Sequence, residues 1–175
     1  MFSTLLDGTT LTVRSLDQKI GWELTDGRDV EMWFEGDNYT YRKYSDGELG
    51  AQLAGLLAKM WSAQRSAHLA VFAQTVPQFV DDSDPVSGRD KLFEDGQQAL
   101  RVSGASKSGR VEIAAVGMAR WDVRIKPGTT REVSDAECLS DFWEAFAALV
   151  DSYRRSMAEL RREIYPPRSR PGPRG

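Results

Sequence analysis

The chain has 175 residues, of which 41% are hydrophobic and 28% charged, and its formal net charge is −3. This composition is ordinary for a folded protein with its own core, and no apolar run approaches the ~18 residues that would span a bilayer. The first residues, MFSTLLDG, lack the basic and apolar regions of a secretory signal. The single cysteine, Cys138, excludes an intrachain disulfide. We therefore expect a cytoplasmic protein with no membrane segment, and the excess of arginine over lysine favours a bacterial source.

Three short segments near the start of the chain alternate apolar and polar residues, as β-strands with one wet face do. They cover residues 11–15, 20–24 and 30–34. The stretch YSDGEL follows, in which Ser45 and Glu48 have the spacing of a capping box. Tyr44 and Leu49 flank that cap at the spacing of a hydrophobic staple. Apolar residues at helical spacing from Leu49 to Trp61 then predict an amphipathic helix.

The same order of elements returns about ninety residues later. Alternating segments cover residues 100–104, 110–114 and 121–125, and VSDAEC repeats the cap with Ser134 and Glu137. At a shift of eighty-nine residues Leu11 falls on Leu100, although the third strand is displaced by two more. We interpret the chain as a duplication. The alternative is that two simple strand and helix patterns converged.

The predicted fold is α+β, with two tandem β-β-β-α units related by a pseudo-twofold axis and a long C-terminal helix. The first unit covers residues 1–76 and the second covers 99–166. Residues 77–98 contain prolines, glycines and acids, which predicts an acidic linker. Residues 167–175 consist mainly of Pro, Arg and Gly, which predicts a disordered basic tail. One unit covers its sheet poorly, so the two units should pack together, either as a pseudodimer in one chain or as a true dimer.

The second helix is predicted to be longer than its sheet is wide. Some thirty residues separate Ser134 from Pro166, a length of ~45 Å, whereas a three-stranded sheet is ~15 Å wide. The apolar stripe continues into this overhang, which predicts a partner-binding surface. Its occupant would be a second chain, the helix of the other unit or a partner protein. The residues concerned are Tyr153, Met157, Leu160 and Ile164.

The C-terminal end is basic although the rest of the chain is acidic. Residues 151–175 carry seven arginines and three acids. These arginines are either a solvated terminus or a surface that binds the phosphates of double-stranded DNA. The candidate nucleic-acid-binding residues are Arg154, Arg155, Arg161, Arg162, Arg168, Arg170 and Arg174.

The sequence contains no pattern that indicates catalysis. His68 is the only histidine and has no sequence cue to a partner, and Cys138 occupies the staple position, where a packed side chain is expected. No cluster of cysteine and histidine has the spacing of a zinc site. GASKSGR lacks the ending of a phosphate-binding loop and joins two predicted strands. We expect a protein with no catalytic residues, no metal and no cofactor.

The second unit resembles the YbaB/EbfC family of nucleoid-associated proteins. The resemblance rests on the order of strands, on RIKPG, and on SDAECL at the start of a long helix. FEGDNYTYRKYSDGEL matches more loosely in the first unit. The resemblance implies a non-enzymatic protein that forms homodimers and binds DNA, or alternatively an accessory protein of type VII secretion without DNA binding.

Members of that family usually have an additional helix before the first strand. Only about ten residues precede the first predicted strand here, so the first unit is expected to lack that helix. The second unit is expected to obtain one only from the first long helix, across the linker.

Overall fold

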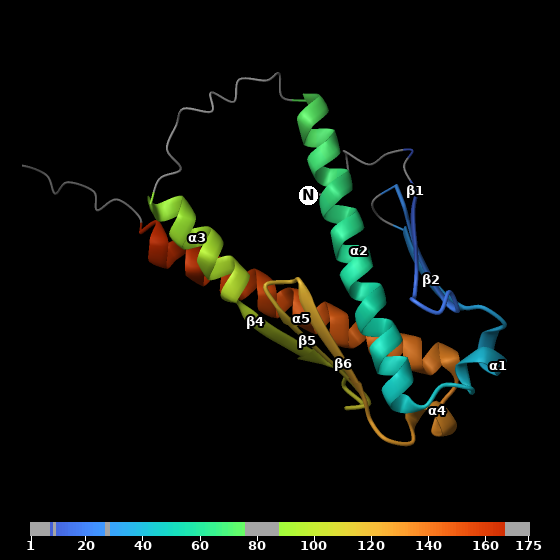
Figure 1. Ribbon diagram of the computed structural model, residues 1–175. Helices are drawn as coiled ribbons and strands as arrows, with labels where there is room; N and C mark the ends of the chain where they lie inside the picture. The colour runs from blue at the N-terminus through green and yellow to red at the C-terminus, as the bar shows by residue number, and fades with distance from the viewer. Residues whose placement is uncertain (1–7, 9, 27–28, 76–87, 167–175) are drawn as a thin grey trace, which may run out of the picture.

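The computed structural model describes residues 8, 10–26, 29–75 and 88–166, and for residues 67–75 it describes the backbone alone (Figure 1). Sheet A consists of β1 (Thr10–Arg14), β2 (Ile20–Thr25) and β3 (Asp29–Phe34). Sheet B consists of β4 (Arg101–Ala105), β5 (Val111–Val116) and β6 (Arg120–Ile125). The helices are α1 (Asp37–Tyr41), α2 (Asp46–Thr75), α3 (Gly88–Ala99), α4 (Thr129–Glu132) and α5 (Asp135–Ile164). This arrangement confirms the predicted α+β class and the long C-terminal helix.

The two sheets have the same strand order and the same antiparallel register. Thr10 lies opposite Thr25 in sheet A, and Arg101 lies opposite Val116 in sheet B. These pairs are ninety-one positions apart, and the same shift relates the pairing of β2 with β3 to that of β5 with β6. The shift of eighty-nine inferred for the first strand is therefore wrong by two, because Leu11 corresponds to Val102 and not to Leu100. The helices keep the shift of eighty-nine, and the difference lies in the connections through α1 and α4.

A buried serine closes the first hairpin of each unit in the same way. The Oγ of Ser15 accepts a hydrogen bond from the N–H of Ile20 at 3.0 Å, and the Oγ of Ser106 accepts one from the N–H of Val111 at 3.1 Å. Each serine N–H also donates to the carbonyl of the same partner residue at 2.9 Å. The turns share almost no sequence except this serine. The common hydrogen bonding therefore supports duplication more strongly than the sequence similarity of the two turns does.

Both long helices begin at the predicted capping boxes. At Ser45, the Oγ accepts from the N–H of Glu48 at 3.2 Å, and the Glu48 carboxylate accepts from the Ser45 N–H at 2.9 Å. Ser134 and Glu137 make the same reciprocal pair at 3.2 and 3.1 Å. These bonds use N–H groups that the first turn of a helix leaves without partners. The predicted starts of both helices are confirmed.

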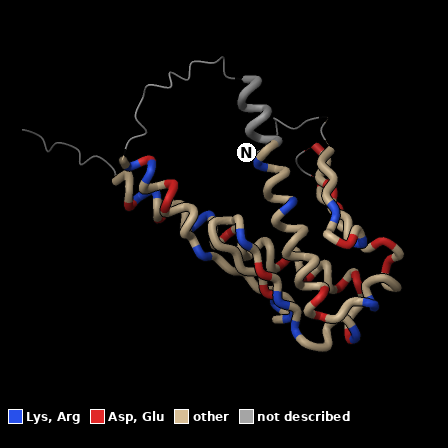
Figure 2. The backbone as a smooth tube through the Cα atoms, viewed as in Figure 1, with Lys and Arg blue, Asp and Glu red and all other residues tan. Residues whose placement is uncertain are grey.

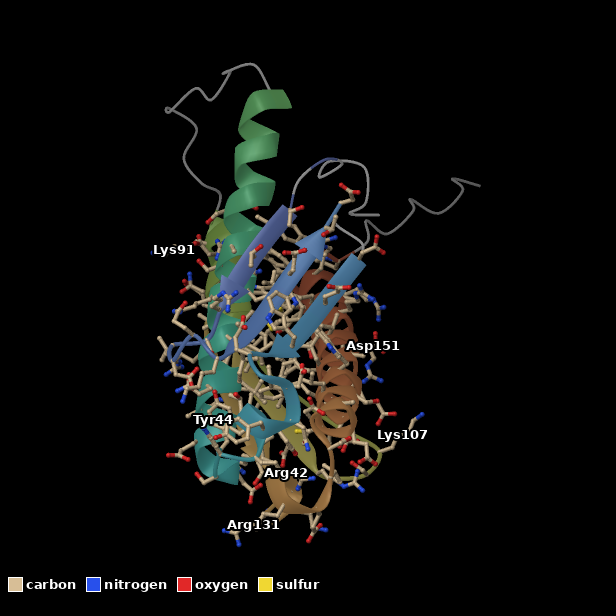
Figure 3. All side chains as sticks on the ribbon, turned by 90° about the vertical axis from the view of Figure 1, so that its right-hand side faces the viewer. Arg42, Tyr44, Lys91, Lys107, Arg131 and Asp151 are labelled. Carbon is tan, nitrogen blue, oxygen red and sulfur yellow. The ribbon has the colours of Figure 1, made fainter. Side chains whose placement is uncertain are left out.

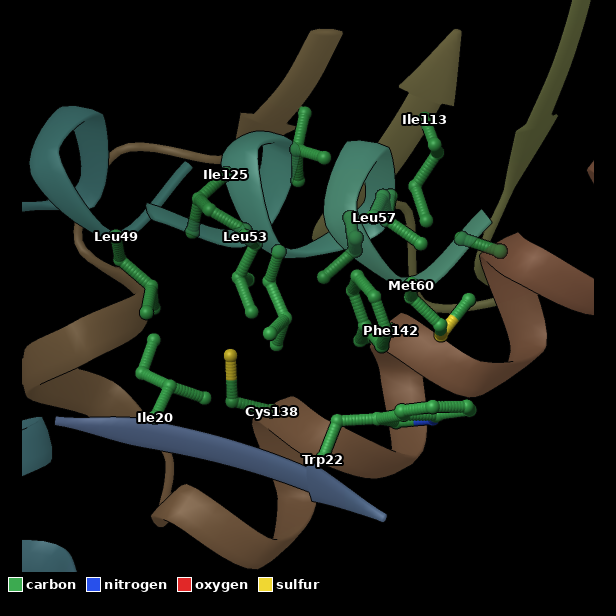
Figure 4. Close-up of a cluster of buried hydrophobic side chains, with 14 of the residues drawn as sticks. Ile20, Trp22, Leu49, Leu53, Leu57, Met60, Ile113, Ile125, Cys138 and Phe142 are labelled. Carbon is green, nitrogen blue, oxygen red and sulfur yellow. The ribbon is translucent and has the colours of Figure 1, made fainter. Parts of the chain in front are cut away.

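The two units share one hydrophobic core (Figure 4). Trp22 of β2 lies near Phe142 of α5 and Met60 of α2, and all three are almost fully buried. The helix of the first unit also packs on a strand of the second, since α2 contacts β6 extensively. The pairing of the units is therefore intramolecular in this structure.

Both long helices approach sheet B more closely than sheet A. A Cβ on Gly104 of β4 would lie 2.2 Å from the carbonyl oxygen of Ala145 in α5. A Cβ on Gly50 of α2 would lie 2.4 Å from the carbonyl oxygen of Val123 in β6. The corresponding positions in the other copy are Val13 and Leu139, which have full side chains. Glycine at these two positions therefore accounts for the closer packing on sheet B.

Helix α3 corrects the prediction of a linker over residues 77–98. Residues from Gly88 onward form a helix that packs against the C-terminal half of α5, and residues 76–87 lie outside the described part of the chain. The helix was missed because its sequence is mostly polar and contains an internal glycine, Gly96. α3 precedes the first strand of the second unit, so that unit does not need the first long helix to supply a leading helix.

The packing at Gly104 predicts a specific stability change. Gly104→Ala should destabilise the fold by about 1–3 kcal/mol, because the new methyl group meets backbone atoms that have no room to move. Gly47→Ala is the matched control, since nothing lies within 4 Å of a Cβ at that position. Urea unfolding of both variants measures the difference. Equal midpoints would show that the close approach of α5 to sheet B is not tight.

The capping boxes predict a second change. Ser45→Ala and Ser134→Ala should each lower the free energy of unfolding by about 1 kcal/mol, since each removes an N-cap acceptor. Ser62→Ala, at an exposed position inside α2, is the control and should change little. Chemical denaturation provides the measurement. Unshifted melts for both cap variants would contradict these helix starts.

Candidate interaction surfaces

The joint between the two units is held by charged and polar side chains of the first unit. The carboxylate of Asp46, in the first turn of α2, accepts hydrogen bonds from the N–H groups of Gly128 and Thr130 at 2.7 and 2.9 Å. Burial alone would raise the pKa of Asp46, but these hydrogen bonds outweigh it and hold the pKa below 3.8. Arg42 donates to the carbonyl of Thr130 at 3.0 Å and also to that of Arg131 (Figure 3). These contacts join the units and have no catalytic arrangement.

Of the two candidate reactive groups, the structure describes the side chain of Cys138. The thiol of Cys138 is buried, and burial raises its pKa to about 11. It therefore stays protonated and packs beside Ile20 and Leu49, as Figure 4 shows. The side chain of His68 lies outside the described residues. In the described part of the chain, no group of three or more His, Cys, Asp or Glu residues is placed to hold a metal ion.

The predicted partner-binding stripe of α5 is covered in part by α3. The amide of Gln97 donates to the hydroxyl of Tyr153 at 3.0 Å, and Leu160 lies against Gly96. The ring of Phe93 packs against Tyr165 with centroids 6.0 Å apart. Met157 and Ile164 are half-buried. A helix of the same chain thus covers Tyr153 and Leu160, and the sequence analysis did not consider this occupant.

The four α5 arginines are all exposed, but the arm that carries them is not basic. We call α3 together with residues 151–165 of α5 the C-terminal arm. In Figure 2 residues of both charge signs alternate along its backbone. Its described residues include six bases and six acids, and Arg168, Arg170 and Arg174 lie outside them. The bases are Arg89, Lys91, Arg154, Arg155, Arg161 and Arg162, and the acids are Asp90, Glu94, Asp95, Asp151, Glu159 and Glu163.

Aromatic side chains line the point where α2 and α5 diverge. The ring of Trp61 in α2 lies 6.1 Å from Trp121 in β6 and 6.1 Å from Tyr153 in α5. Phe146 continues the cluster at 6.4 Å from Trp121. All four are half-buried, and beyond them both helices extend away from the sheets (Figure 1). We call Trp61, Trp121, Phe146 and Tyr153 the aromatic notch.

The sequence analysis did not identify this notch. It placed Trp61 on a buried helical stripe and Trp121 on an alternating strand. One signal in the sequence could have indicated the notch: aromatic residues stand where the predicted apolar segments reach the end of a sheet. Only the crossing of the helices brings them together.

Two shallow surface depressions are open to solvent, and the second of them borders the notch at Trp121. One, lined by polar groups, includes Asp17, Lys43 and Tyr44. Although burial acts to raise the pKa of Asp17, hydrogen bonds from Ser15 and Tyr44 lower it below 3.8. The other lies over sheet B and includes Arg101, Arg120 and Asp122. In the first depression the hydroxyl of Tyr44 donates to the Asp17 carboxylate at 2.5 Å.

The fold and these surfaces define a duplicated two-sheet protein with projecting helices. No family model, no curated protein and no solved structure matches this chain. Among the residues with described structure, no helix has the length and apolar character needed to cross a membrane.

The hydrogen bonds at Asp46 predict acid sensitivity. The folded-state pKa of Asp46 lies below its unfolded value of 3.8. Ionised Asp46 therefore contributes its full stability above the unfolded pKa, and this stability is lost as the pH falls through the folded-state pKa. Asp46→Asn should lower the free energy of unfolding at pH 7 by about 1–2 kcal/mol and flatten its dependence on pH near 3–4. Thermal melts across this range measure the effect.

Asp135→Asn is the matched control for that experiment. Asp135 stands at the equivalent position of α5, and its carboxylate accepts from the N–H of the neighbouring Ala136 at 2.8 Å. The backbone N–H of Asp135 donates to the side-chain oxygen of Asn38 in the other unit at 3.3 Å, but this bond does not use the carboxylate that the substitution changes. Equal losses in the two variants would contradict a special role for Asp46 in joining the units.

Proposed function

We propose that this chain is a non-enzymatic scaffold protein that binds another protein at the aromatic notch. The observation that supports this most directly is the half-buried state of Trp61, Trp121 and Tyr153 at the divergence of two long helices. Tryptophan and tyrosine dominate the energetic centres of protein interfaces, because they bury a large area at low entropic cost. The resemblance to YbaB/EbfC proteins also supports a non-enzymatic binding role.

The surroundings of the notch suit an apolar segment with polar flanks. A helix lies on each side of the notch. α2 continues for several turns past Trp61, and α5 is packed against α3 past Tyr153. The described arm carries equal numbers of acids and bases, so it does not select a strongly charged partner. An amphipathic helix of a partner protein fits these requirements, with its apolar side against the notch.

The test places a photoreactive amino acid beside the notch in cells that express the chain. At Gln64, one turn beyond Trp61 on the same side of α2, irradiation should yield a discrete adduct with a second protein. At Ser66, which is exposed on another side of α2, it should not. Trp61→Ala should abolish the Gln64 adduct without loss of the helical circular dichroism signal. The same adducts at both positions, or none at Gln64, would refute the proposal.

Binding of double-stranded DNA is the second candidate, favoured by the exposure of all four α5 arginines and by the family resemblance. A positive result is retardation of a duplex at micromolar protein in about 50 mM salt and its loss near 200 mM, because phosphate contacts release counterions. Replacing Arg154, Arg155, Arg161 and Arg162 by Gln should then abolish binding, whereas Arg101→Gln on sheet B should not. Absence of retardation at the lower salt would exclude this candidate.

A further inference from the structure

The two sheets present differently charged outer faces to solvent. In sheet A the central row of the outer face runs through Thr12, Glu23 and Glu31, which lie directly opposite one another on neighbouring strands. In sheet B one row of the outer face runs through Arg101, Val116 and Arg120. Arg101, Arg120 and Glu31 are exposed, and Glu23 is partly so. One face is therefore acidic at its centre, and the other has two arginines flanking a valine.

The glutamates of sheet A are not neutralised within the described residues. Glu23 accepts a hydrogen bond from the hydroxyl of Thr12 at 3.1 Å, and neither Glu23 nor Glu31 is among the ion pairs of the described residues. Like charges directly opposite on neighbouring strands destabilise the pairing. A cation placed between the two carboxylates would remove that penalty.

The arginines of sheet B carry the opposite charge at a wider spacing. Arg101 and Arg120 stand on the two edge strands of the sheet, about 10 Å apart at the backbone, and neither belongs to an ion pair of the described residues. Arg124 of the same face differs, because it pairs with Asp122 at 3.0 Å. The shallow depression between the arginines has a floor that includes Ala114 and Val116.

We propose that the chain self-associates head to tail, with the outer face of sheet B of one molecule docked on the outer face of sheet A of another. Arg101 and Arg120 of one copy then approach Glu23 and Glu31 of the next. A second copy is the occupant because the two faces carry opposite charge on sheets of identical topology and register. The depression on the arginine face is also lined by Trp121 of the aromatic notch, but none of these four charged residues belongs to the notch.

The symmetry of this contact has a measurable consequence. It joins two different faces, so each added copy leaves one face of each kind exposed, and the assembly grows beyond a dimer unless the rotation closes a ring. Sedimentation velocity of the full chain in about 50 mM salt should show a mass that rises with concentration. In about 1 M salt, where the screening length is near 3 Å, the chain should be monomeric.

Neutral variants of each face provide the decisive test. R101Q/R120Q retains the acidic face alone, and E23Q/E31Q retains the arginine face alone, so each variant by itself should be monomeric. A one-to-one mixture should form a heterodimer that grows no further, because each molecule contributes its single intact face. R154Q/R155Q, on the C-terminal arm, is the control and should assemble like the unaltered chain.

Several results would overturn the proposal. The proposal fails if the unaltered chain is monomeric in low salt at every concentration. It also fails if a chain with both double substitutions associates as well as the unaltered chain. A mixture of the two neutral variants that stays monomeric, while each variant keeps the circular dichroism spectrum of the unaltered chain, also refutes it. Because the notch residues are untouched in all these variants, failure here is distinguishable from failure of the photocrosslinking experiment.

Discussion

The close approach of both long helices to sheet B is the contact on which the rest of the structure depends. Gly104 lets the backbone of α5 lie against β4, and Gly50 lets α2 lie against β6. The helix of the first unit therefore packs on the sheet of the second. A single core forms from two units that are each too small to cover a sheet. The asymmetry follows as well, since Val13 and Leu139 hold the other sheet further away.

Close packing at one end of the helices leaves their other ends projecting. α2 and α5 each have thirty residues, whereas the strands have five or six. The distal turns of α5 are covered by α3, which adds three acids and two bases to the four arginines and three acids of residues 151–165. The projecting arm therefore has balanced charge among its described residues, and the aromatic notch lies at its base.

The two similar units share their inner faces more closely than their solvent-exposed outer faces. The inner faces retain apolar residues at equivalent positions, such as Trp22 and Ile113, because both contribute to the same core. On the outer faces, Glu23 and Glu31 of sheet A correspond to Ala114 and Asp122 of sheet B. A difference in charge between equivalent faces can therefore arise without loss of the fold.

The sequence by itself determined the elements whose signals are short-range. The alternation of apolar and polar residues predicted all six strands to within two residues. The three-residue spacing of Ser45 from Glu48 and of Ser134 from Glu137 predicted their reciprocal hydrogen bonds. Tertiary structure alone decided the shift of ninety-one between the strands, the docking of α3 and the bonds from Asp46 to the other unit. These depend on contacts between residues far apart in the chain, which local periodicity does not encode. The notch is of the same kind, because Trp61 and Tyr153 meet only where two helices cross on a sheet that contains glycine.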